Sequence, residues 1–422
     1  MIKTEDYLNK LKKPDMKRLG VIFIVFLMSY ELCPAQTAGG VVRRKENNTQ
    51  KNNKGGTSIK QQTPAKTIIF QDPSGFSEGF ASITINGKCG YIDKSGLIVI
   101  PCKYESAGLF KDSLACVKLN GKYGFIDYKG REIIPCKYDN AFDFFREGLV
   151  CVEYSGRWGF IDKTGKVIIP CKYQRVESFS EGLAMAMLND KWGYIDKTGN
   201  VVIPFKYEHD NIYYLRGFHE GLALVKINAP CSSYINQDGE IVISSTRFPF
   251  ATYPYGYFCE GLAIGWRGGK YGFLDKTGKE VVSIKYSRVE NFKNGLAKVE
   301  LEGEWGMVDK NGDEVIPCVY DRIGSFHEGL AYFEMNGEFG YVNQTGKEVL
   351  QCKYSDAGDF VEGLAYVKLN GKFGYIDKSG AVVIPFKYSD AYNFSDGFAR
   401  VKLNGRWAFI NKNGVPLKIK IR

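Results

Sequence analysis

Histidine is scarce in this chain of 422 residues, and metal-binding patterns of cysteine are absent. The histidines are His209, His219 and His327, and none of the eleven cysteines forms a Cys-x-x-Cys pair. Zinc sites use cysteine and histidine ligands at short spacings, and a Cys-His or Ser-His nucleophile needs unique residues that converge in space. Nearly every Ser, Asp and Glu here belongs instead to a repeated position. We therefore expect no catalytic residue, no metal site and no cofactor.

A membrane-spanning run is also lacking, because the apolar segment at residues 19–30 is only twelve residues long. It follows Lys17 and Arg18, and small residues stand at Cys33 and Ala35. This order of features is typical of a secretory signal peptide. We predict cleavage after about residue 35 and export to the periplasm, the cell surface or the medium, with no transmembrane domain left. A buried apolar segment, an uncleaved anchor, a lipid anchor on Cys33 and a start at Met16 stay open.

The folded part of the chain also lacks a large excess of basic residues. The chain has 57 Lys/Arg and 47 Asp/Glu, of which residues 1–66 hold 13 and 5, so 44 basic and 42 acidic residues remain. Nucleic-acid binding would need the basic excess on the folded part, so we expect no nucleic-acid partner. Residues 36–66 are rich in Asn, Gln, Lys, Gly and Thr, which predicts a disordered basic linker.

What the sequence does contain is a repeat over residues 67–422. Its landmark is an acidic or polar residue, a small residue, and then Leu or Phe, usually followed by Ala. The central residue occurs ten times, about 34 residues apart, at Gly79, Ser113, Gly148, Gly182, Gly221, Gly261, Gly295, Gly329, Gly363 and Gly397. The intervals that end at Gly221 and Gly261 are 39 and 40 residues long.

Each unit predicts a three-stranded antiparallel meander. In the seventh unit Ala297, Val299 and Leu301 alternate with charged residues, which indicates a half-buried strand. A hairpin turn such as Asn370-Gly371 leads to an aromatic-Gly-aromatic strand, and a Lys-Thr-Gly turn leads to a Val/Ile-rich third strand. Helical repeats of similar length do not fit, because glycines recur and no 3.6-residue period is present.

These units resemble the bacterial WG-repeat family, also called KWG repeats. The resemblance rests on segments such as 157–162, 191–196 and 304–309, each with Trp-Gly, and on the Pro that ends the third strand in most units. Ser233 and Ala408 depart from the family glycine. The resemblance implies a repeat scaffold and no particular reaction.

The glycine of the aromatic-Gly pair predicts a close approach, because glycine otherwise weakens a strand. We expect an aromatic ring of an adjacent strand or unit to pack over it. The cysteines Cys102, Cys136, Cys171, Cys318 and Cys352 share one repeat position with Phe205, Ile284 and Phe386, which indicates apolar packing. A ladder of disulfides between units is not expected, since equivalent positions should lie too far apart; a single bridge stays open.

The units must share a core with their neighbours, which allows two arrangements. We predict an all-β tandem array of about ten units that is open, solenoid-like or superhelical. A closed, propeller-like ring is the alternative, which the usual number of four to eight blades disfavours.

The two longer intervals indicate where a binding site would lie, because insertions in repeats project as loops. They carry tyrosines and phenylalanines, which suit binding surfaces. The predicted site residues are Tyr213, Tyr214, Phe248, Phe250, Tyr253, Tyr255 and Tyr257. We expect a non-catalytic exported scaffold that binds protein or glycan. The alternatives are a structural spacer, or an enzyme with a site in residues 205–260.

Overall fold

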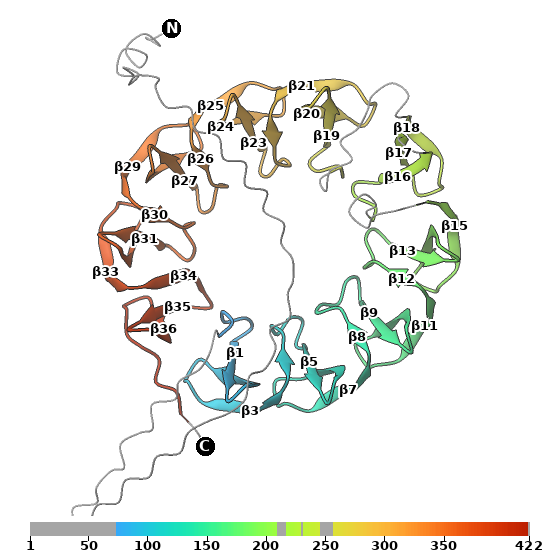
Figure 1. Ribbon diagram of the computed structural model, residues 1–422, viewed down its shortest axis with the longest axis horizontal. Coiled ribbons are helices and arrows are strands. Elements are labelled where there is room, and N and C mark those ends of the chain that lie inside the picture. The colour runs from blue at the N-terminus through green and yellow to red at the C-terminus, as the bar shows by residue number, and fades with distance from the viewer. Residues whose placement is uncertain (1–72, 209–216, 229–230, 245–255, 421–422) are drawn as a thin grey trace, which may run out of the picture. The chain divides into compact units, whose positions relative to one another are not determined.

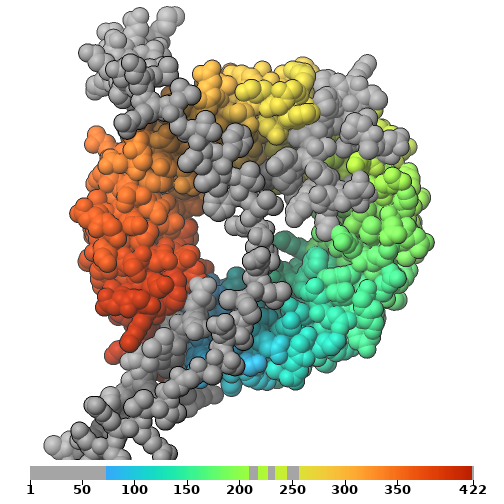
Figure 2. All heavy atoms as spheres, viewed as in Figure 1, coloured from blue at the N-terminus to red at the C-terminus, as the bar shows by residue number. Residues whose placement is uncertain are grey.

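The fold was analysed in a computed structural model that describes residues 73–208, 217–228, 231–244 and 256–420. Residues 65–422 form one compact unit, and the predicted leader and linker lie outside the described residues. The described residues form ten small antiparallel sheets, which Figure 1 shows as blades arranged in a ring. The space-filling view in Figure 2 shows an opening inside this ring of blades. The third long strands, such as β7 and β33, lie at the outer rim (Figure 1).

The blades are numbered 1 to 10 along the chain. Blades 1 to 3 hold β1 (Phe80–Ile85), β2 (Lys88–Asp93) and β3 (Ile98–Tyr104); β4 (Ser106–Ala107), β5 (Ala115–Leu119), β6 (Lys122–Ile126) and β7 (Glu132–Tyr138); β8 (Asn140–Ala141), β9 (Leu149–Tyr154), β10 (Arg157–Asp162) and β11 (Val167–Tyr173). Blades 4 to 6 hold β12 (Arg175–Val176), β13 (Leu183–Leu188), β14 (Lys191–Asp196) and β15 (Val201–Tyr207); β16 (Ala223–Asn228), β17 (Cys231–Ile235) and β18 (Ile241–Ser244); β19 (Leu262–Arg267), β20 (Lys270–Asp275) and β21 (Glu280–Tyr286). Blades 7 and 8 hold β22 (Arg288–Val289), β23 (Leu296–Leu301), β24 (Glu304–Asp309) and β25 (Glu314–Tyr320); β26 (Arg322–Ile323), β27 (Leu330–Met335), β28 (Glu338–Asn343) and β29 (Glu348–Tyr354). Blades 9 and 10 hold β30 (Asp356–Ala357), β31 (Ala365–Leu369), β32 (Lys372–Ile376) and β33 (Val382–Tyr388); β34 (Asp390–Ser395), β35 (Phe398–Leu403) and β36 (Arg406–Asn411).

The predicted meander is present in blades 1 to 9, whereas the last blade has no third long strand among the described residues. Six of the ten sheets have in addition a fourth strand, which is two residues long, precedes the first long strand and pairs with it. It lies in the polar segment that follows the tyrosine at the end of the third long strand, such as Tyr320, where the sequence predicted no strand. A strand this short carries too little alternation to be recognised by pattern.

The prediction of an open array is wrong, because the two ends of the repeat region meet. Lys420 accepts a hydrogen bond from the Ile98 amide at 3.0 Å and donates one to the Gly96 carbonyl at 2.7 Å. The Gly79 amide donates to Asp396 at 2.7 Å, and Phe76 packs with Phe409 in a mixed core of the first and last blades. The alternative, a closed propeller-like ring, is the observed fold (Figure 1).

The apolar cores lie between blades rather than within a single centre. Each cluster of buried side chains joins one face of a blade to the facing side of the next, as Leu149 and Phe160 of blade 3 join Val176 and Ala184 of blade 4. A blade therefore has two apolar faces, and each requires a neighbour. This requirement explains why the array closes: an open end would leave one face exposed to water.

A charged contact recurs between successive blades and is called the inter-blade latch here. Its acid stands in the turn before the first long strand, and it accepts the backbone amide of the next blade's equivalent turn. Glu328 accepts the Gly363 amide at 3.1 Å and pairs with Lys378 at 3.0 Å. The same arrangement joins Glu147 to Gly182 and Lys197, Glu220 to Gly261 and Lys276, Glu260 to Gly295 and Lys310, Glu362 to Gly397 and Lys412, and Asp396 to Gly79 and Lys94.

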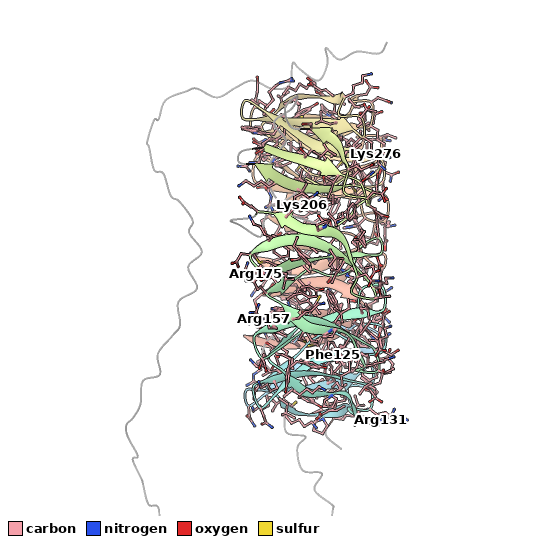
Figure 3. All side chains as sticks on the ribbon, turned by 90° about the vertical axis from the view of Figure 1, so that its right-hand side faces the viewer. Phe125, Arg131, Arg157, Arg175, Lys206 and Lys276 are labelled. Atoms are coloured by element: carbon pink, nitrogen blue, oxygen red, sulfur yellow. The ribbon has the colours of Figure 1, made fainter. Side chains whose placement is uncertain are left out.

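The two ends of the strands form two faces of the ring. Figure 3 places Lys276, from the latch turns, toward one face, and Arg157, from a hairpin turn, toward the other. On the hairpin face, carboxylates that follow the Lys-Tyr motif accept turn amides of the next hairpin, as Asp321 does from Asn336 at 2.6 Å. Both faces are thus built from repeated turns.

The glycine of the aromatic-Gly pair is required by backbone rather than by a ring. A Cβ on Gly306 would lie 2.5 Å from the Ile316 carbonyl oxygen and 2.7 Å from the Cys318 amide nitrogen. The third strand makes this approach because it bulges: Trp305 pairs with Tyr320 and Met307 with Ile316. A ring approaches the glycine as well in a few blades, as Phe205 does at Gly193. The expected close approach is therefore confirmed, but its main partner was predicted wrongly.

The two departures from the glycine have the same physical reason. Ser233 pairs directly with Ser244, where β18 ends, so no bulge is described opposite it. Ala408 lies in the last blade, whose described sheet ends with β36 and has no third long strand. At both positions, the described residues include no bulged third strand that would approach the side chain.

Replacing Gly306 by alanine should lower the free energy of unfolding by about 1–3 kcal/mol, the usual cost of forcing an atom into a packed site. The matched change Ala408→Gly should cost less, about 0.5–1 kcal/mol for strand glycine. Urea denaturation of the two variants measures the difference. Equal losses would contradict the close approach at Gly306.

Stability should also fall in acid because of the latches. Partial burial acts to raise the pKa of Glu328, but hydrogen bonds from Lys378 and the Gly363 amide lower the pKa below its ordinary value of 4.5. A carboxylate whose pKa is lowered on folding stabilises the folded protein above its ordinary pKa, and this stabilisation is lost as the pH falls through the lowered pKa. Glu328→Gln should therefore destabilise the protein at pH 7, by less than about 1 kcal/mol, and this difference should shrink as the pH falls below 4.5. Urea midpoints at pH 7 and at acid pH test it, with Glu302→Gln as the control; a pH-independent effect would contradict the assignment.

Candidate functional site

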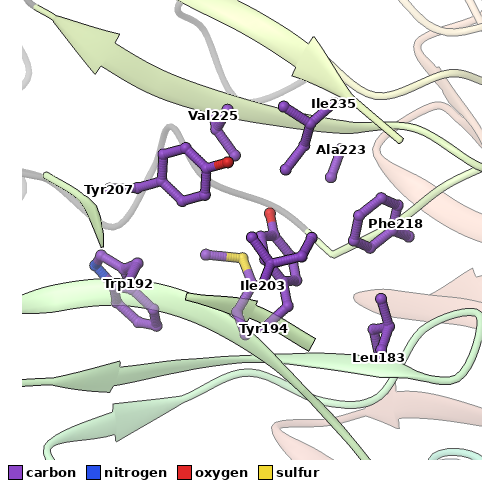
Figure 4. Close-up of a cluster of buried hydrophobic side chains, with 10 residues drawn as sticks. Leu183, Trp192, Tyr194, Ile203, Tyr207, Phe218, Ala223, Val225 and Ile235 are labelled. Carbon is purple, nitrogen blue, oxygen red and sulfur yellow. The ribbon is translucent and has the colours of Figure 1, made fainter. Parts of the chain in front are cut away.

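An aromatic pair repeats at the junctions between blades. A ring on the second long strand of one blade packs against a phenylalanine that precedes the first long strand of the next. Figure 4 shows the junction of blades 4 and 5, where Tyr194 and Phe218 lie with ring centroids 4.9 Å apart. Nine junctions have this pair, with centroid distances of 4.7–5.2 Å: Tyr91–Phe110, Phe125–Phe145, Phe160–Phe179, Tyr194–Phe218, Tyr234–Phe258, Phe273–Phe292, Tyr341–Phe360, Tyr375–Phe394 and Phe409–Phe76.

The junction of blades 7 and 8 lacks the pair, because Met307 stands where the other blades have a ring. Its counterpart, Phe326, is only half-buried, whereas the nine equivalent phenylalanines are buried. A cavity of about 480 Å³ lies here, within the size range of small-molecule and side-chain pockets. It is lined by Tyr257, Cys259, Glu290, Asn291, Phe292, Lys293, Leu296, Lys298, Met307, Ser325 and Phe326.

The same junction departs from the latch pattern. The ten acid positions all carry a carboxylate except Asn294, and the corresponding lysine position in blade 8 carries Gln344. The lysine is also replaced in blade 2, by Tyr128, and in blade 5, by Gln237, but at those two junctions the acid is kept. The junction of blades 7 and 8 is therefore the one place in the ten repeats where both the acid and the lysine of the latch are replaced.

Charged side chains surround the cavity in pairs. Glu290 and Lys298 form an ion pair at 2.7 Å. His327 lies between Lys293 and Asp359, with Nε2 3.1 Å from the lysine Nζ and Nδ1 3.1 Å from the aspartate Oδ2. Burial raises the pKa of Asp359, although His327, Lys293 and Lys298 oppose the shift. The two ring nitrogens of His327 thus face a cation and a carboxylate rather than a hydroxyl or thiol that they could activate.

Cys259 is the thiol that lines the cavity. Its sulfur donates to the Phe292 carbonyl at 3.0 Å, and burial raises its pKa, with Glu260 and Glu220 adding to the shift. A raised pKa keeps the thiol protonated at neutral pH, which makes it a poor nucleophile. The nine cysteines that the structure describes are free.

One of the predicted site residues, Tyr257, lies at this cavity. Its ring packs on His219 with centroids 4.6 Å apart. The other six, Tyr213, Tyr214, Phe248, Phe250, Tyr253 and Tyr255, lie outside the described residues. Sequence reasoning missed Met307, Phe326 and Lys298. Their signal was available: Met307 is the single non-aromatic residue in its column of the ten aligned repeats.

Among the described residues, no group of three or more His, Cys, Asp or Glu side chains could hold a metal ion. No helix in that part of the chain is long and apolar enough to cross a bilayer.

A closed ring of small antiparallel sheets defines a β-propeller, here with ten blades. The model of the family "WG containing repeat" matches residues 90–123, 123–158, 158–192, 192–229, 271–305, 305–338, 339–373 and 373–407. The chain therefore belongs to the WG-repeat family. Between residues 90 and 407, the matches leave out residues 230–270. This segment holds most of the second longer interval, the one that ends at Gly261.

No curated protein sequence matches the chain. Several solved structures resemble its fold at low identity. The crystal structure of the eukaryotic initiation factor is 9% identical, with 72% of this chain and 95% of that chain covered and a TM-score of 0.45. BamB from Moraxella catarrhalis is 12% identical, with 72% and 98% covered and a TM-score of 0.31. Hsv2p from Kluyveromyces lactis is 10% identical, with 56% and 92% covered and a TM-score of 0.29. Similarity this low carries no functional inference.

Restoring the missing ring should stabilise the protein. Met307→Phe should raise the free energy of unfolding by about 0.5–2 kcal/mol, as cavity filling commonly does. The reverse change at the preceding junction, Phe273→Met, should lower it, because that ring is packed against Phe292. Thermal unfolding of both variants tests this. Destabilisation by Met307→Phe would show that the cavity cannot accept a ring.

Proposed function

We propose that this protein is an exported, non-catalytic binding scaffold that holds a protein partner at the cavity between blades 7 and 8. The observation that carries the proposal is the loss of the aromatic pair at that junction alone. Nine junctions fill the equivalent space with a ring from the chain itself. The tenth has both the space and one surviving ring, Phe326.

The chemistry around the cavity supports binding over catalysis. Glu290 and Lys298 form an ion pair, and the Oδ2 atom of Asp359 lies 3.1 Å from Nδ1 of His327. The thiol of Cys259 is held protonated by its burial. Hydrolysis or group transfer would need an activated nucleophile near a base, and these contacts supply neither.

The proposed export rests on the sequence of the leader. We still predict a signal peptide over 1–35, a disordered linker over 36–66 and a repeat region over 67–422. With this organisation, the protein would act at the cell envelope or outside the cell. The six aromatic residues outside the described part also stay predicted contributors to binding. A glycan partner and a purely structural spacer are the alternatives.

Capture of partners from the native exported fraction tests the proposal. The wild-type chain should retain one or more proteins that Met307→Phe fails to retain, because the added ring occupies the space beside Phe326. Met187→Phe, at a half-buried methionine of blade 4, is the matched control and should behave like the wild type. Retention of the same proteins by all three chains would remove the cavity from consideration, and retention of none would favour the spacer.

A further inference from the structure

We infer that the cavity takes the side chain of a tyrosine from the partner protein, which completes the interrupted row of aromatic pairs. This inference rests on the proposed function and adds the chemical identity of the group that is bound.

The position of the missing ring is defined by the other nine junctions. In each of them the second-strand ring lies 4.7–5.2 Å from the phenylalanine of the next blade. At the junction of blades 7 and 8 that phenylalanine, Phe326, is present and lines the cavity, and the ring that should face it is absent. Met307 also lines the cavity, and a thioether makes favourable contacts with aromatic edges. An aromatic group is therefore the natural occupant.

The hydroxyl group is indicated by a second repeated contact. Four second-strand tyrosines donate their hydroxyl to a backbone carbonyl of the next blade: Tyr91 to Gly108 at 2.7 Å, Tyr234 to Gly256 at 2.7 Å, Tyr341 to Gly358 at 2.8 Å, and Tyr375 to Tyr392 at 2.8 Å. The equivalent carbonyl of blade 8 belongs to Gly324, beside the lining residue Ser325. A tyrosine that entered the cavity in the same pose would donate to it.

A further acceptor lies in the lining. The Oδ1 atom of Asn291 is buried and has no hydrogen-bond donor among the described residues. The same is true of the equivalent Asn393 in blade 10, so this atom by itself does not distinguish the junction. A donor group on the bound side chain would nevertheless form a hydrogen bond with this oxygen, which an aliphatic side chain would leave unpaired.

The charges of the lining favour a ring carried by a polypeptide. Lys293 and Glu290 are exposed, and Lys298 is half-buried beside Glu290. Charges of both signs can contact the peptide groups and the flanking side chains on either side of a tyrosine. A free phenol would engage none of them.

The test uses the full chain labelled with 13C in its methionine methyl groups. The Met307 signal is assigned from Met307→Leu, and the buried Met185 of blade 4 serves as the internal control. The probes are capped pentapeptides Gly-Ser-X-Ser-Gly, with X as Tyr, Phe or Leu, together with p-cresol and chitotriose. We expect the tyrosine peptide to shift the Met307 methyl signal by its ring current, to leave Met185 unmoved, and to bind roughly two- to tenfold more tightly than the leucine peptide. Phenylalanine should fall between them, and Met307→Phe should abolish binding of all three peptides.

The inference is overturned if the leucine peptide binds as tightly as the tyrosine peptide, if p-cresol alone binds as tightly as the peptide, or if only chitotriose moves the Met307 signal. In those cases partner capture that depends on Met307 would still support the proposed function. If Met307→Phe also changes no partner capture, the proposed function itself fails.

Discussion

The contact between neighbouring blades is the interaction on which this structure depends. Each sheet is apolar on both faces, so its stability requires a blade on either side. The first and last blades meet this requirement by packing against each other, through Phe76, Phe409 and the hydrogen bonds of Lys420. The ring closes because each end blade would otherwise expose an apolar face to water. The latches add direction, because each carboxylate reaches the amide of the following blade and not of the preceding one.

Repetition also decides where specificity can arise. A side chain that recurs in every blade serves the contact between blades, since the same contact recurs with it. A site for one partner must come from a departure, and the junction of blades 7 and 8 combines three departures. There Met307 replaces a ring, Asn294 replaces a carboxylate, and Gln344 replaces a lysine. The first change leaves space, and the other two remove the charges that bind the two turns together.

Much of the fold could be predicted because the same pattern of strands and turns recurs in ten units. The alternation at Ala297, Val299 and Leu301 indicated a strand, and the aromatic-Gly pair indicated a close approach that the structure shows at Gly306. The site was harder to predict. Insertions drew attention to Tyr257, which does line the cavity, but the cavity itself is made by a methionine in an ordinary strand. Met307 is visible in the sequence as the exception in an aromatic column, but its consequence follows only once it is known that this column faces a phenylalanine of the next blade.

By itself, the sequence determined the all-β class, the ten units, the antiparallel meander and the membership of a repeat family, because these follow from local alternation, turn chemistry and periodicity. Only the tertiary structure decided that the array closes, that the family glycine makes room for a bulged backbone, and that one junction holds a cavity. These three depend on contacts between residues that are distant along the chain, such as Gly96 with Lys420 or Phe326 with Met307. Local patterns specify which face of a strand is apolar, but they do not specify which surface covers it.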